Sequence, residues 1–389
     1  MQLFSEEMRR NPYPVYERMR IESPVLHVPA ADLWMVFDYA GVKRALSDTE
    51  AFSSNVSPAK GGSFEWLLFL DPPRHTKLRA IVSRAFTPAS VANLEPRIHQ
   101  ISCKLLDAVT GQGHMDLAED FAVPLPMMIV AEMIGIPSAD WRRLRQWSDA
   151  IMNLADTITG GAEASAQAAI GFGAANREMQ EYLHELTAER RVCPADDLLT
   201  RLTAAEVDGE RLEEEEILRF VQLLLAAGTE TTTNLINNAI LCLVEHPEEM
   251  LRLRKSPELL PAAIEEVLRY RSPGQAMFRV TRRDVELQGQ AIPAGRFVLA
   301  MVGSANRDPE QFADADRFDI SRQPNAHIAF GHGIHFCLGA PLSRLEARVG
   351  LTVLLGRAHD IELVSDRPWE PRKAFHVHGP KSLPIRFSR

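Results

Sequence analysis

Near the C-terminal end of the chain stands the stretch Phe330-Gly331-His332-Gly333-Ile334-His335-Phe336-Cys337-Leu338-Gly339-Ala340. Two glycines precede the cysteine, and they permit a tight turn and a close approach of the backbone. Gly339 leaves the far side of Cys337 free of a side chain. A helical pattern follows over 341–354, so the cysteine stands where a helix begins. Backbone N–H groups and the helix dipole at such a position favour a thiolate.

A thiolate in this loop suits a nucleophile, a zinc ligand or a haem ligand. The dinucleotide-binding fingerprint fails, because the position that requires a third glycine is Phe336. The two histidines of the loop and Cys337 resemble zinc ligands, but no second Cys/His pair completes a tetrahedral set at a usual spacing. The loop alone therefore leaves these roles open, together with a buried structural role for the cysteine.

A second unusual segment lies at 212–245, which predicts a helix of roughly 50 Å that could cross a whole domain. Its middle contains Gly228-Thr229-Glu230-Thr231, although glycine costs about 1 kcal/mol in a helix interior and threonine is also unfavourable there. Thr side chains can bond to helix carbonyls and bend the helix. The segment predicts either a core helix with a packing glycine, or a distorted helix that presents an acid and a hydroxyl to a pocket.

Most of the remaining chain has the apolar spacing of helices, and shorter alternating segments predict strands. The expected fold class is therefore mainly α with small antiparallel β-sheets, an α+β arrangement. The turn Ile292-Pro-Ala-Gly295 fits a hairpin corner, and 159–173, rich in Gly and Ala, is expected to be flexible. Further helices are expected over 89–109, 141–153, 176–191, 247–255 and 261–270, and strands over 33–37, 276–281, 285–287 and 296–301.

The composition disfavours several classes of protein. Among 389 residues, 43 Lys and Arg stand against 52 Asp and Glu, and the net charge of −9 disfavours nucleic acid as a partner. No two of the four cysteines form a CxxC pair, which disfavours a disulfide scaffold. The first residues lack the apolar core of a signal peptide, and 217–244 is too polar to span a bilayer. We therefore expect a cytoplasmic protein without a membrane anchor.

Five blocks of the sequence resemble one family. Residues 330–340 resemble the haem-binding loop of the cytochrome P-450 superfamily, the haem-thiolate monooxygenases, and A-G-T-E-T-T at 227–232 resembles its oxygen-activating central helix. The blocks lie in the family's order and cover the chain from about residue 12 to its end. The other three are Glu266-Val-Leu-Arg269 for the E-x-x-R helix, Ala315-Asp-Arg317-Phe318 for its third charged arm, and Asp71-Pro-Pro-Arg-His75-Thr-Lys-Leu-Arg79 for the propionate-binding helix of soluble bacterial members.

The resemblance implies a cytochrome P-450 fold in a single domain over 1–389. Haem b, iron protoporphyrin IX, would lie between the central helix and the helix after the cysteine loop. Cys337 would ligate the iron, with Phe330 packed beside the sulfur and Gly339 leaving space next to it. The implied ligands of the two propionates are His75, Arg79, Arg279 and His335, because buried carboxylates need charged partners.

The same resemblance assigns the catalytic groups. Thr231 would hold the iron-bound oxygen, Glu230 would relay protons from solvent, and Gly228 would leave room for dioxygen. The residues Glu266, Arg269 and Arg317 would form a structural triad that supports the cysteine loop.

An apolar chamber should receive the substrate, although each candidate lining residue could equally be ordinary core. The segment before Asp71 contains Glu65 but no Arg, so we expect a neutral, hydrophobic, medium-sized substrate rather than a fatty acid. The candidate lining residues are Phe64, Trp66, Leu67, Leu68, Phe69, Leu223, Leu224, Ala227, Met277, Phe278 and the hairpin tip 375–378 with Val377.

The resemblance thus implies a monooxygenase that hydroxylates or epoxidises a hydrophobic small molecule with O2. No flavin or ferredoxin module fits in the sequence, so electrons would come from a ferredoxin or flavodoxin with its reductase, and we expect a monomer. Such donors are acidic and would need a local basic patch, for which Lys77, Arg84, Arg344 and Arg348 are candidates. The alternatives are a peroxide-driven peroxygenase on the same fold and a non-catalytic haem-binding sensor.

Overall fold

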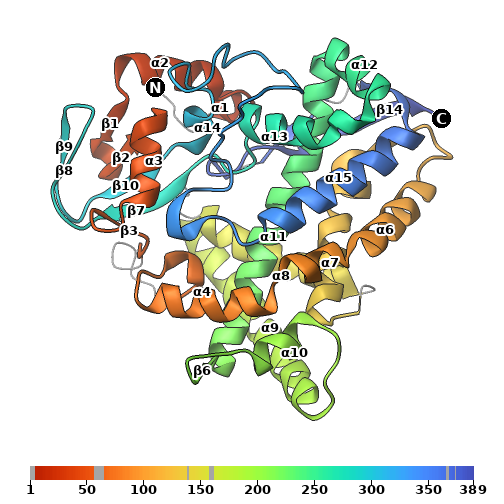
Figure 1. Cartoon of the computed structure of the whole chain (residues 1–389), viewed down its shortest axis with the longest axis horizontal. Helices are drawn as coiled ribbons and strands as arrows, with labels where there is room; N and C mark the ends of the chain where they lie inside the picture. The colour runs from red at the N-terminus through yellow and green to blue at the C-terminus, as the bar shows by residue number, and fades with distance from the viewer. Residues whose placement is uncertain (1–4, 57–64, 138–139, 157–161, 365–367, 373) are drawn as a thin grey trace.

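The computed structural model describes residues 5–56, 65–137, 140–156, 162–364, 368–372 and 374–389. Helices dominate it, and the long helix α11 (Glu214–Glu245) runs through the middle of the molecule (Figure 1). Glu213 and Glu216 form a capping box at its start, which satisfies backbone N–H groups that a helix N-terminus leaves without partners. Residues 232–243 are all buried, so this half of α11 belongs to the core on every side.

Helices α7 (Pro124–Ile134), α8 (Trp141–Asp156), α13 (Leu260–Tyr270) and α15 (Ala340–Arg357) pack against α11. A hydrogen bond of 3.1 Å from Thr232 Oγ1 to Ser343 Oγ ties α11 to α15, the helix that follows the cysteine. The other helices are α1 (Glu6–Arg10), α2 (Tyr13–Glu22), α3 (Tyr39–Ser47), α4 (Arg74–Ala85), α5 (Pro88–Ala92), α6 (Glu95–Asp107), α9 (Ala162–Val192), α10 (Leu198–Ala204), α12 (Pro247–Lys255) and α14 (Val302–Ala305).

The main sheet has the strand order β1-β2-β10-β7-β3, in which β2 and β10 are parallel and the other neighbours antiparallel. Smaller sheets have the orders β11-β14-β4, β12-β13, β5-β6 and β8-β9. The strands are β1 (Val25–Val28), β2 (Leu33–Val36), β3 (Phe52–Ser53), β4 (His114–Asp116), β5 (Glu206–Val207), β6 (Glu210–Arg211), β7 (Met277–Thr281), β8 (Val285–Leu287), β9 (Gln290–Ile292), β10 (Phe297–Ala300), β11 (His359–Leu363), β12 (Glu370–Pro371), β13 (Pro380–Ser382) and β14 (Pro384–Ser388).

The two faces of the main sheet pack on different helices. Val298 and Ala300 share a core cluster with α3, whereas Leu299 lies in a cluster with α2. Arg279 pairs with Val298, and Phe278 pairs with Leu299. Because side chains alternate along a strand, Arg279 and Phe278 lie on opposite faces of the sheet.

The mainly helical prediction is confirmed, and two of its details are wrong. The predicted helix 89–109 is two helices, α5 and α6. The helical hydrogen bonding is interrupted at 93–94, and Pro96 lies in the first turn of α6, a position that proline favours. The segment expected to be flexible is helical from Ala162 onward, as the first turns of α9. The predicted strands lie within one residue of β2, β7, β8 and β10 at each end.

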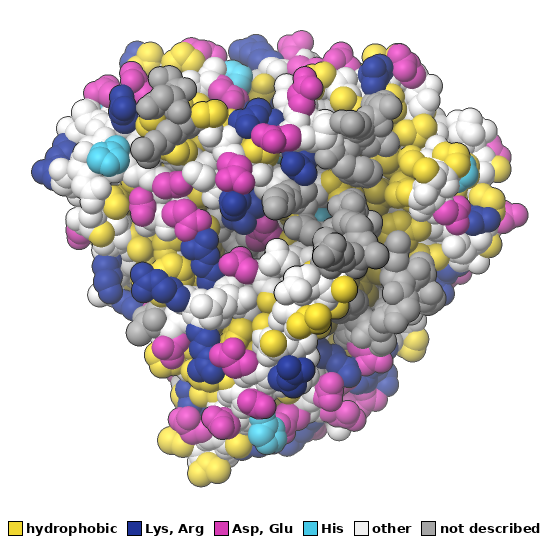
Figure 2. Space-filling model, turned by 180° about the vertical axis from the view of Figure 1, so that it is seen from behind, with side chains coloured by type: hydrophobic (Ala, Val, Ile, Leu, Met, Phe, Trp, Pro, Cys, Tyr) yellow, Lys and Arg dark blue, Asp and Glu magenta, His cyan; other side chains and the backbone are white. Residues whose placement is uncertain are grey.

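The surface carries both signs of charge. Figure 2 shows acidic and basic side chains interspersed over the described part of one face, with apolar side chains between them. Although the whole chain has a net charge of −9, the acidic side chains on this face do not form one continuous patch. Within the described residues, no helix is both long and apolar enough to cross a membrane.

Candidate active site

The cysteine loop, residues 330–340, is held by its own backbone and by neighbouring elements. The N–H of Cys337 donates to the carbonyl oxygen of Phe330 at 2.9 Å and closes the loop. Gly331 and Gly333 have φ values of 77° and 75°, in the left-handed region that favours glycine. A Cβ on Gly333 would lie 3.0 Å from backbone atoms of α3, and one on Gly331 would lie 3.3 Å from a side chain of β7. The backbone conformation therefore favours glycine at both positions, and at Gly333 the backbone of α3 also leaves little room for a Cβ.

The thiol of Cys337 lies where α15 begins. Burial raises the pKa of Cys337, while the N–H groups of Gly339 and Ala340 and the guanidinium groups of Arg79 and Arg344 lower it. The N–H groups at the helix start therefore favour the thiolate, as expected, but burial has the larger effect on the pKa of Cys337. A coordinated metal ion would reverse this balance, because it deprotonates its thiol ligand. The sulfur lies 3.9 Å from the position a Cβ would take on Gly339.

Two histidines and an arginine form a buried group of donors beside the loop. The rings of His75 and His335 lie with their centroids 4.1 Å apart. Both ring nitrogens of His75 and Nε2 of His335 are buried without a hydrogen-bond partner among the described residues. Burial lowers the pKa of Arg279 to about 10, and burial and neighbouring charges lower the pKa of His335 to about 3. Arg279 Nη1 donates to the carbonyl of Phe278 at 2.7 Å, but the buried histidine nitrogens have no such partner. Buried polar groups of this kind fit the carboxylates of a bound group, which two haem propionates would supply.

Arg79 has a different partner from the other predicted propionate ligands. Its Nη2 donates to the carbonyl oxygen of Phe336 at 2.7 Å, so Arg79 links α4 to the cysteine loop. The charge of Cys337 raises its pKa, while burial, the larger effect, lowers it. The structure therefore directs Arg79 toward the cysteine, and His75, one turn earlier on α4, toward His335.

One face of α11 is open in the middle of this largely buried helix. Ala227 is exposed and Leu223, Leu224, Gly228 and Thr231 are partly exposed, while their neighbours on the other faces are buried. The spacing of three and four residues places all five on one side of the helix. The helix runs unbroken through this region, so the predicted distortion is absent from its backbone. One expected feature is present: the Thr231 hydroxyl donates to the carbonyl of Ala227, four residues earlier, at 2.7 Å.

Arg372, which no sequence motif singled out, lies beside Glu230. Its Nε is 3.4 Å from Oε1 of Glu230, and the two side chains are 21% and 10% exposed. Arg372 directly follows β12, which is far from Glu230 along the chain. Only the tertiary fold brings the two residues together, so no local spacing in the sequence could have indicated the pair.

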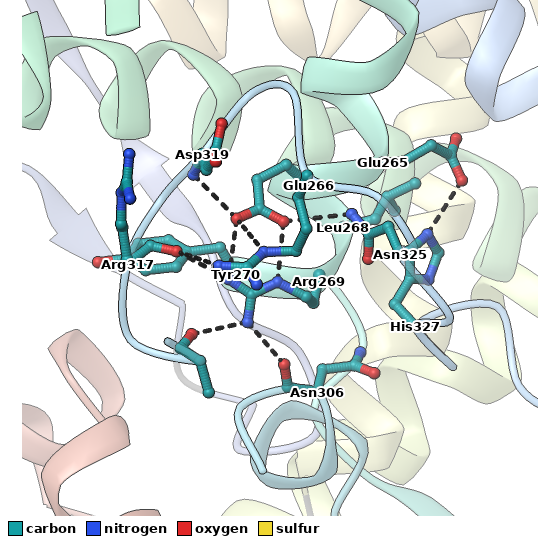
Figure 3. Close-up of polar contacts among 12 residues, drawn as sticks. Glu265, Glu266, Leu268, Arg269, Tyr270, Asn306, Arg317, Asp319, Asn325 and His327 are labelled. Atoms are coloured by element: carbon teal, nitrogen blue, oxygen red, sulfur yellow. Dashed lines mark hydrogen bonds and ion pairs between the residues drawn. The ribbon is translucent and has the colours of Figure 1, made fainter. Parts of the chain in front are cut away.

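The predicted triad is formed in part, and its third member is wrong. Glu266 and Arg269 are fully buried and form two hydrogen bonds of 2.8 Å (Figure 3). Arg317 meets Arg269 only through its backbone carbonyl, 3.1 Å from Nη2, and Figure 3 shows its side chain turned away from Glu266. The side chain that completes the cluster is Arg322, whose Nε donates to Glu266 Oε1 at 3.1 Å.

Arg322, which the sequence prediction missed, binds the same segment that contains Arg317. Arg322 donates to the carbonyls of Ala313, Asp314 and Arg317, so it fastens the very turn that the A-D-R-F motif marks. The motif identified the correct segment. It could not distinguish a side chain that enters the core from one that leaves it.

The candidate lining residues fall into different surroundings. Trp66 Nε1 donates to Gln222 Oε1 of α11 at 3.4 Å, and the Trp66 ring stacks on Phe69, so this segment lies against α11. Leu67 lines a cavity of about 420 Å³ at the start of α11, and the described residues around that cavity do not include the cysteine loop. Leu68 is exposed, and Phe64 lies outside the described residues.

The candidates from β7 and the hairpin tip divide between two faces. Met277 reaches the cysteine loop, with its Cε 3.3 Å from the Cβ position on Gly331. Phe278, on the opposite face, packs against Phe297 and Phe375 in the cluster under α2. Strand alternation therefore separates two residues that were predicted to line one chamber. Val377 is buried, and its backbone bridges to Gly274.

A cysteine at the start of α15, the partly exposed face of α11 and the buried imidazole nitrogens of His75 and His335 are features that a haem-thiolate enzyme would need. The sequence profile of the family described as Cytochrome P450 matches residues 112–378. Cytochrome P450 109 of Bacillus spizizenii is 42% identical over 393 residues, which covers 100% of this chain and 94% of that protein.

Two further comparisons agree. Cytochrome P450 monooxygenase PikC of Streptomyces venezuelae is 39% identical over 400 residues, covering 99% of this chain and 93% of that protein. The crystal structure of CYP109E1 from Bacillus megaterium in complex with corticosterone superposes with a TM-score of 0.89 at 41% identity, covering 98% of this chain and 99% of that one. The chain therefore belongs to the cytochrome P450 family, monooxygenases that bind haem b through a cysteine thiolate.

Proposed function

We propose that this protein inserts one oxygen atom from O2 into a hydrophobic small molecule, using electrons from a separate donor protein. The observation that carries the proposal is the open face of α11, where Thr231 and Glu230 stand together among apolar side chains. A peroxide-driven enzyme or a haem-binding sensor has no need of an acid and a hydroxyl at this position, because neither must deliver protons to reduced oxygen.

Haem bound to Cys337 would supply the iron at which oxygen is activated, and the chain's own residues would do the rest. His75, His335 and Arg279 would bind the two carboxylates of the group and orient it. Phe330, 9% exposed, would keep water from the sulfur. These residues would fix the position of the reaction relative to α11.

The distal residues would position substrate and move protons. The Thr231 hydroxyl donates to a helix carbonyl, which leaves its oxygen lone pairs free to accept and orients the group toward the open face. Glu230 would pass protons from solvent toward that hydroxyl. Leu223, Leu224 and Ala227 would form apolar contacts and select a hydrophobic substrate. The corticosterone seen in the related structure is a ligand of that chemical kind.

The electron donor would dock near the cysteine loop. The four candidate basic residues are engaged within the chain: Arg344 with Glu265, Arg348 with Glu95, Lys77 with Glu210, and Arg84 with a backbone carbonyl. An acidic ferredoxin or flavodoxin would therefore compete with internal partners for these charges.

The experiment is turnover of the haem-loaded protein with an external reductase, a reduced ferredoxin and isotopically labelled O2. A panel of steroids and other neutral hydrophobic compounds would first be screened for a low-to-high-spin shift of the iron. One labelled oxygen atom per product molecule, dependent on the electron donor, is the expected result. Product without label, or equal rates with peroxide alone, would overturn the proposal.

A further inference from the structure

One carboxylate on α13 contacts the segments at both ends of the cysteine loop. Oε2 of Glu265 lies 3.0 Å from Nε2 of His327, in the segment that leads into the loop (Figure 3). The same carboxylate accepts two hydrogen bonds of 2.7 Å from Nε and Nη2 of Arg344, on α15, the helix that leads out of the loop. Glu265 therefore fixes the two segments on either side of Cys337 relative to each other.

The contact between Glu265 and His327 has a defined direction. Nδ1 of His327 accepts a hydrogen bond of 3.3 Å from the N–H of Ala329, so the proton of the neutral imidazole stands on Nε2 and is donated to Glu265. Burial raises the pKa of Glu265, but Arg344 and His327 lower it to about 2. Glu265 is therefore a carboxylate at neutral pH, held from one side by a side chain that is 4% exposed.

The guanidinium group of Arg344 lies over the ring of Phe330. Its Cζ is 4.5 Å from the ring centroid, and a cation at that distance is attracted to the aromatic face. Two hydrogen bonds to one carboxylate fix the plane of the guanidinium group. The carbonyl of Phe330 accepts the hydrogen bond from Cys337 that closes the loop. Glu265 thus determines where a positive charge stands beside the residue that packs on the cysteine loop.

This charge acts on the sulfur. Burial raises the pKa of Cys337, and the charge of Arg344 is among the effects that lower it. In turn, the hydrogen bonds to Glu265 raise the pKa of Arg344, and the charge of Cys337 raises it further. Arg344 therefore interacts with the cysteine as well as with the carboxylate that holds it.

We propose that Glu265, itself held by His327, is a positioning residue that clamps the Arg344 guanidinium over Phe330, and that this fixed positive charge raises the reduction potential of haem bound to Cys337. Reduction adds one electron from the donor protein and changes no bond of these residues. A nearby positive charge favours the reduced state, because reduction adds one negative charge to the site. The inference rests on Cys337 as the iron ligand, which the spectrum with carbon monoxide tests separately.

The test is an anaerobic reductive titration of the haem-loaded protein against a dye of known potential. Arg344→Gln removes the charge and should lower the equilibrium constant for reduction about fivefold. Arg344→Lys keeps the charge but loses the two-bond contact, so its constant should fall between those of wild type and Arg344→Gln. Arg357→Gln is the matched control, because Arg357 lies on the same helix, is likewise 38% exposed and is also paired with one carboxylate. It should leave the constant unchanged.

A double-mutant cycle separates the clamp from the charge alone. Without the Glu265 carboxylate the guanidinium group is free to move into water, so in a Glu265→Gln background Arg344→Gln should change the constant by less than about twofold. All variants should keep the long-wavelength band with carbon monoxide, which shows that Cys337 still ligates the iron.

Equal effects of Arg344→Gln in the two backgrounds, or a constant equal to that of Arg357→Gln, would overturn the inference. Where Arg344→Gln fails to fold, Arg344→Lys decides, since a constant equal to that of wild type would show that the clamp geometry has no effect. Failure of the proposed function has a separate signature: product without labelled oxygen, whatever the titration shows.

Discussion

At the scale of single residues, the hydroxyl of Thr231 is the group that the proposed chemistry depends on most. Thr231→Ala keeps the helix and the chamber but removes the only polar atom of that side chain, so electrons should still be consumed while product per electron pair falls by about tenfold or more. Peroxide or water should appear instead. The measurement is the ratio of product to electron donor consumed. Thr231→Ser retains the hydroxyl and should stay close to wild type; an equally coupled Thr231→Ala protein would contradict the role.

Glu346 on α15 predicts a pH dependence of stability. It is 1% exposed, its Oε1 has no partner among the described residues, and burial raises its pKa to about 8 from an ordinary 4.5. Between these values the folded protein binds one proton more than the unfolded chain, so the free energy of unfolding falls as pH rises, by at most about 1.4 kcal/mol per pH unit, and levels off above the folded value.

The variant Glu346→Gln should therefore lose this dependence and gain stability relative to wild type at pH 8. Melting temperatures measured from pH 5 to pH 9 check the slope. Glu95→Gln, an exposed residue on α6, serves as the control and should keep the wild-type slope. Parallel curves for wild type and Glu346→Gln would show that Glu346 is ionised in the folded protein.

At the scale of elements, the buried cluster on α13 fixes the segment that leads to the cysteine loop. Arg322→Ala leaves Glu266 with one charged partner fewer and frees three carbonyls, so it should destabilise the protein by about 2–4 kcal/mol. Arg317→Ala removes an exposed side chain and should change stability by less than about 0.5 kcal/mol. Denaturant unfolding of both variants measures the difference. Equal effects would contradict the assignment of the third arm to Arg322.

The donor-docking proposal also belongs to one element, α15. Arg348 lies in the half of the helix nearer the cysteine, and Arg357 lies at its far end, each paired with one carboxylate. Arg348→Glu should slow reduction by an acidic ferredoxin about tenfold at low salt, and the effect should shrink as salt is added. Arg357→Glu, the same change away from the loop, should have little effect. Stopped-flow reduction would contradict the proposal if both variants behaved like wild type.

The elements of the site differ in how far the sequence could predict them. The tight turn at Gly331 and the open face of α11 follow from local spacing, because a loop glycine and a helix face are properties of neighbouring residues. The role of Cys337 came from the resemblance of its loop to the family, since the spacing alone left several roles open. Arg322 and Arg372 were missed because their roles depend on contacts with segments distant in the chain. Phe278 was misplaced because an apolar residue on a two-sided sheet fits either core.

At the scale of the whole molecule, the helices around α11 and the main sheet bring distant segments to one place. The loop before α15, helix α4 and strand β7 all contribute to the surroundings of Cys337, through the carbonyl of Phe336 and the space around Gly331. The distribution of surface charge did not indicate where the site lies, because acidic and basic groups are interspersed on the face shown in Figure 2. That residues 1–389 form a single domain stays a prediction.

The most direct test of the central claim is the absorption spectrum of the haem-loaded, reduced protein with carbon monoxide. Thiolate ligation by Cys337 predicts a Soret band shifted to the long wavelength that distinguishes haem-thiolate proteins, and Cys337→His should move it to the position of histidine-ligated haem. A protein that binds no haem, or a wild-type band already at the histidine position, would contradict the account.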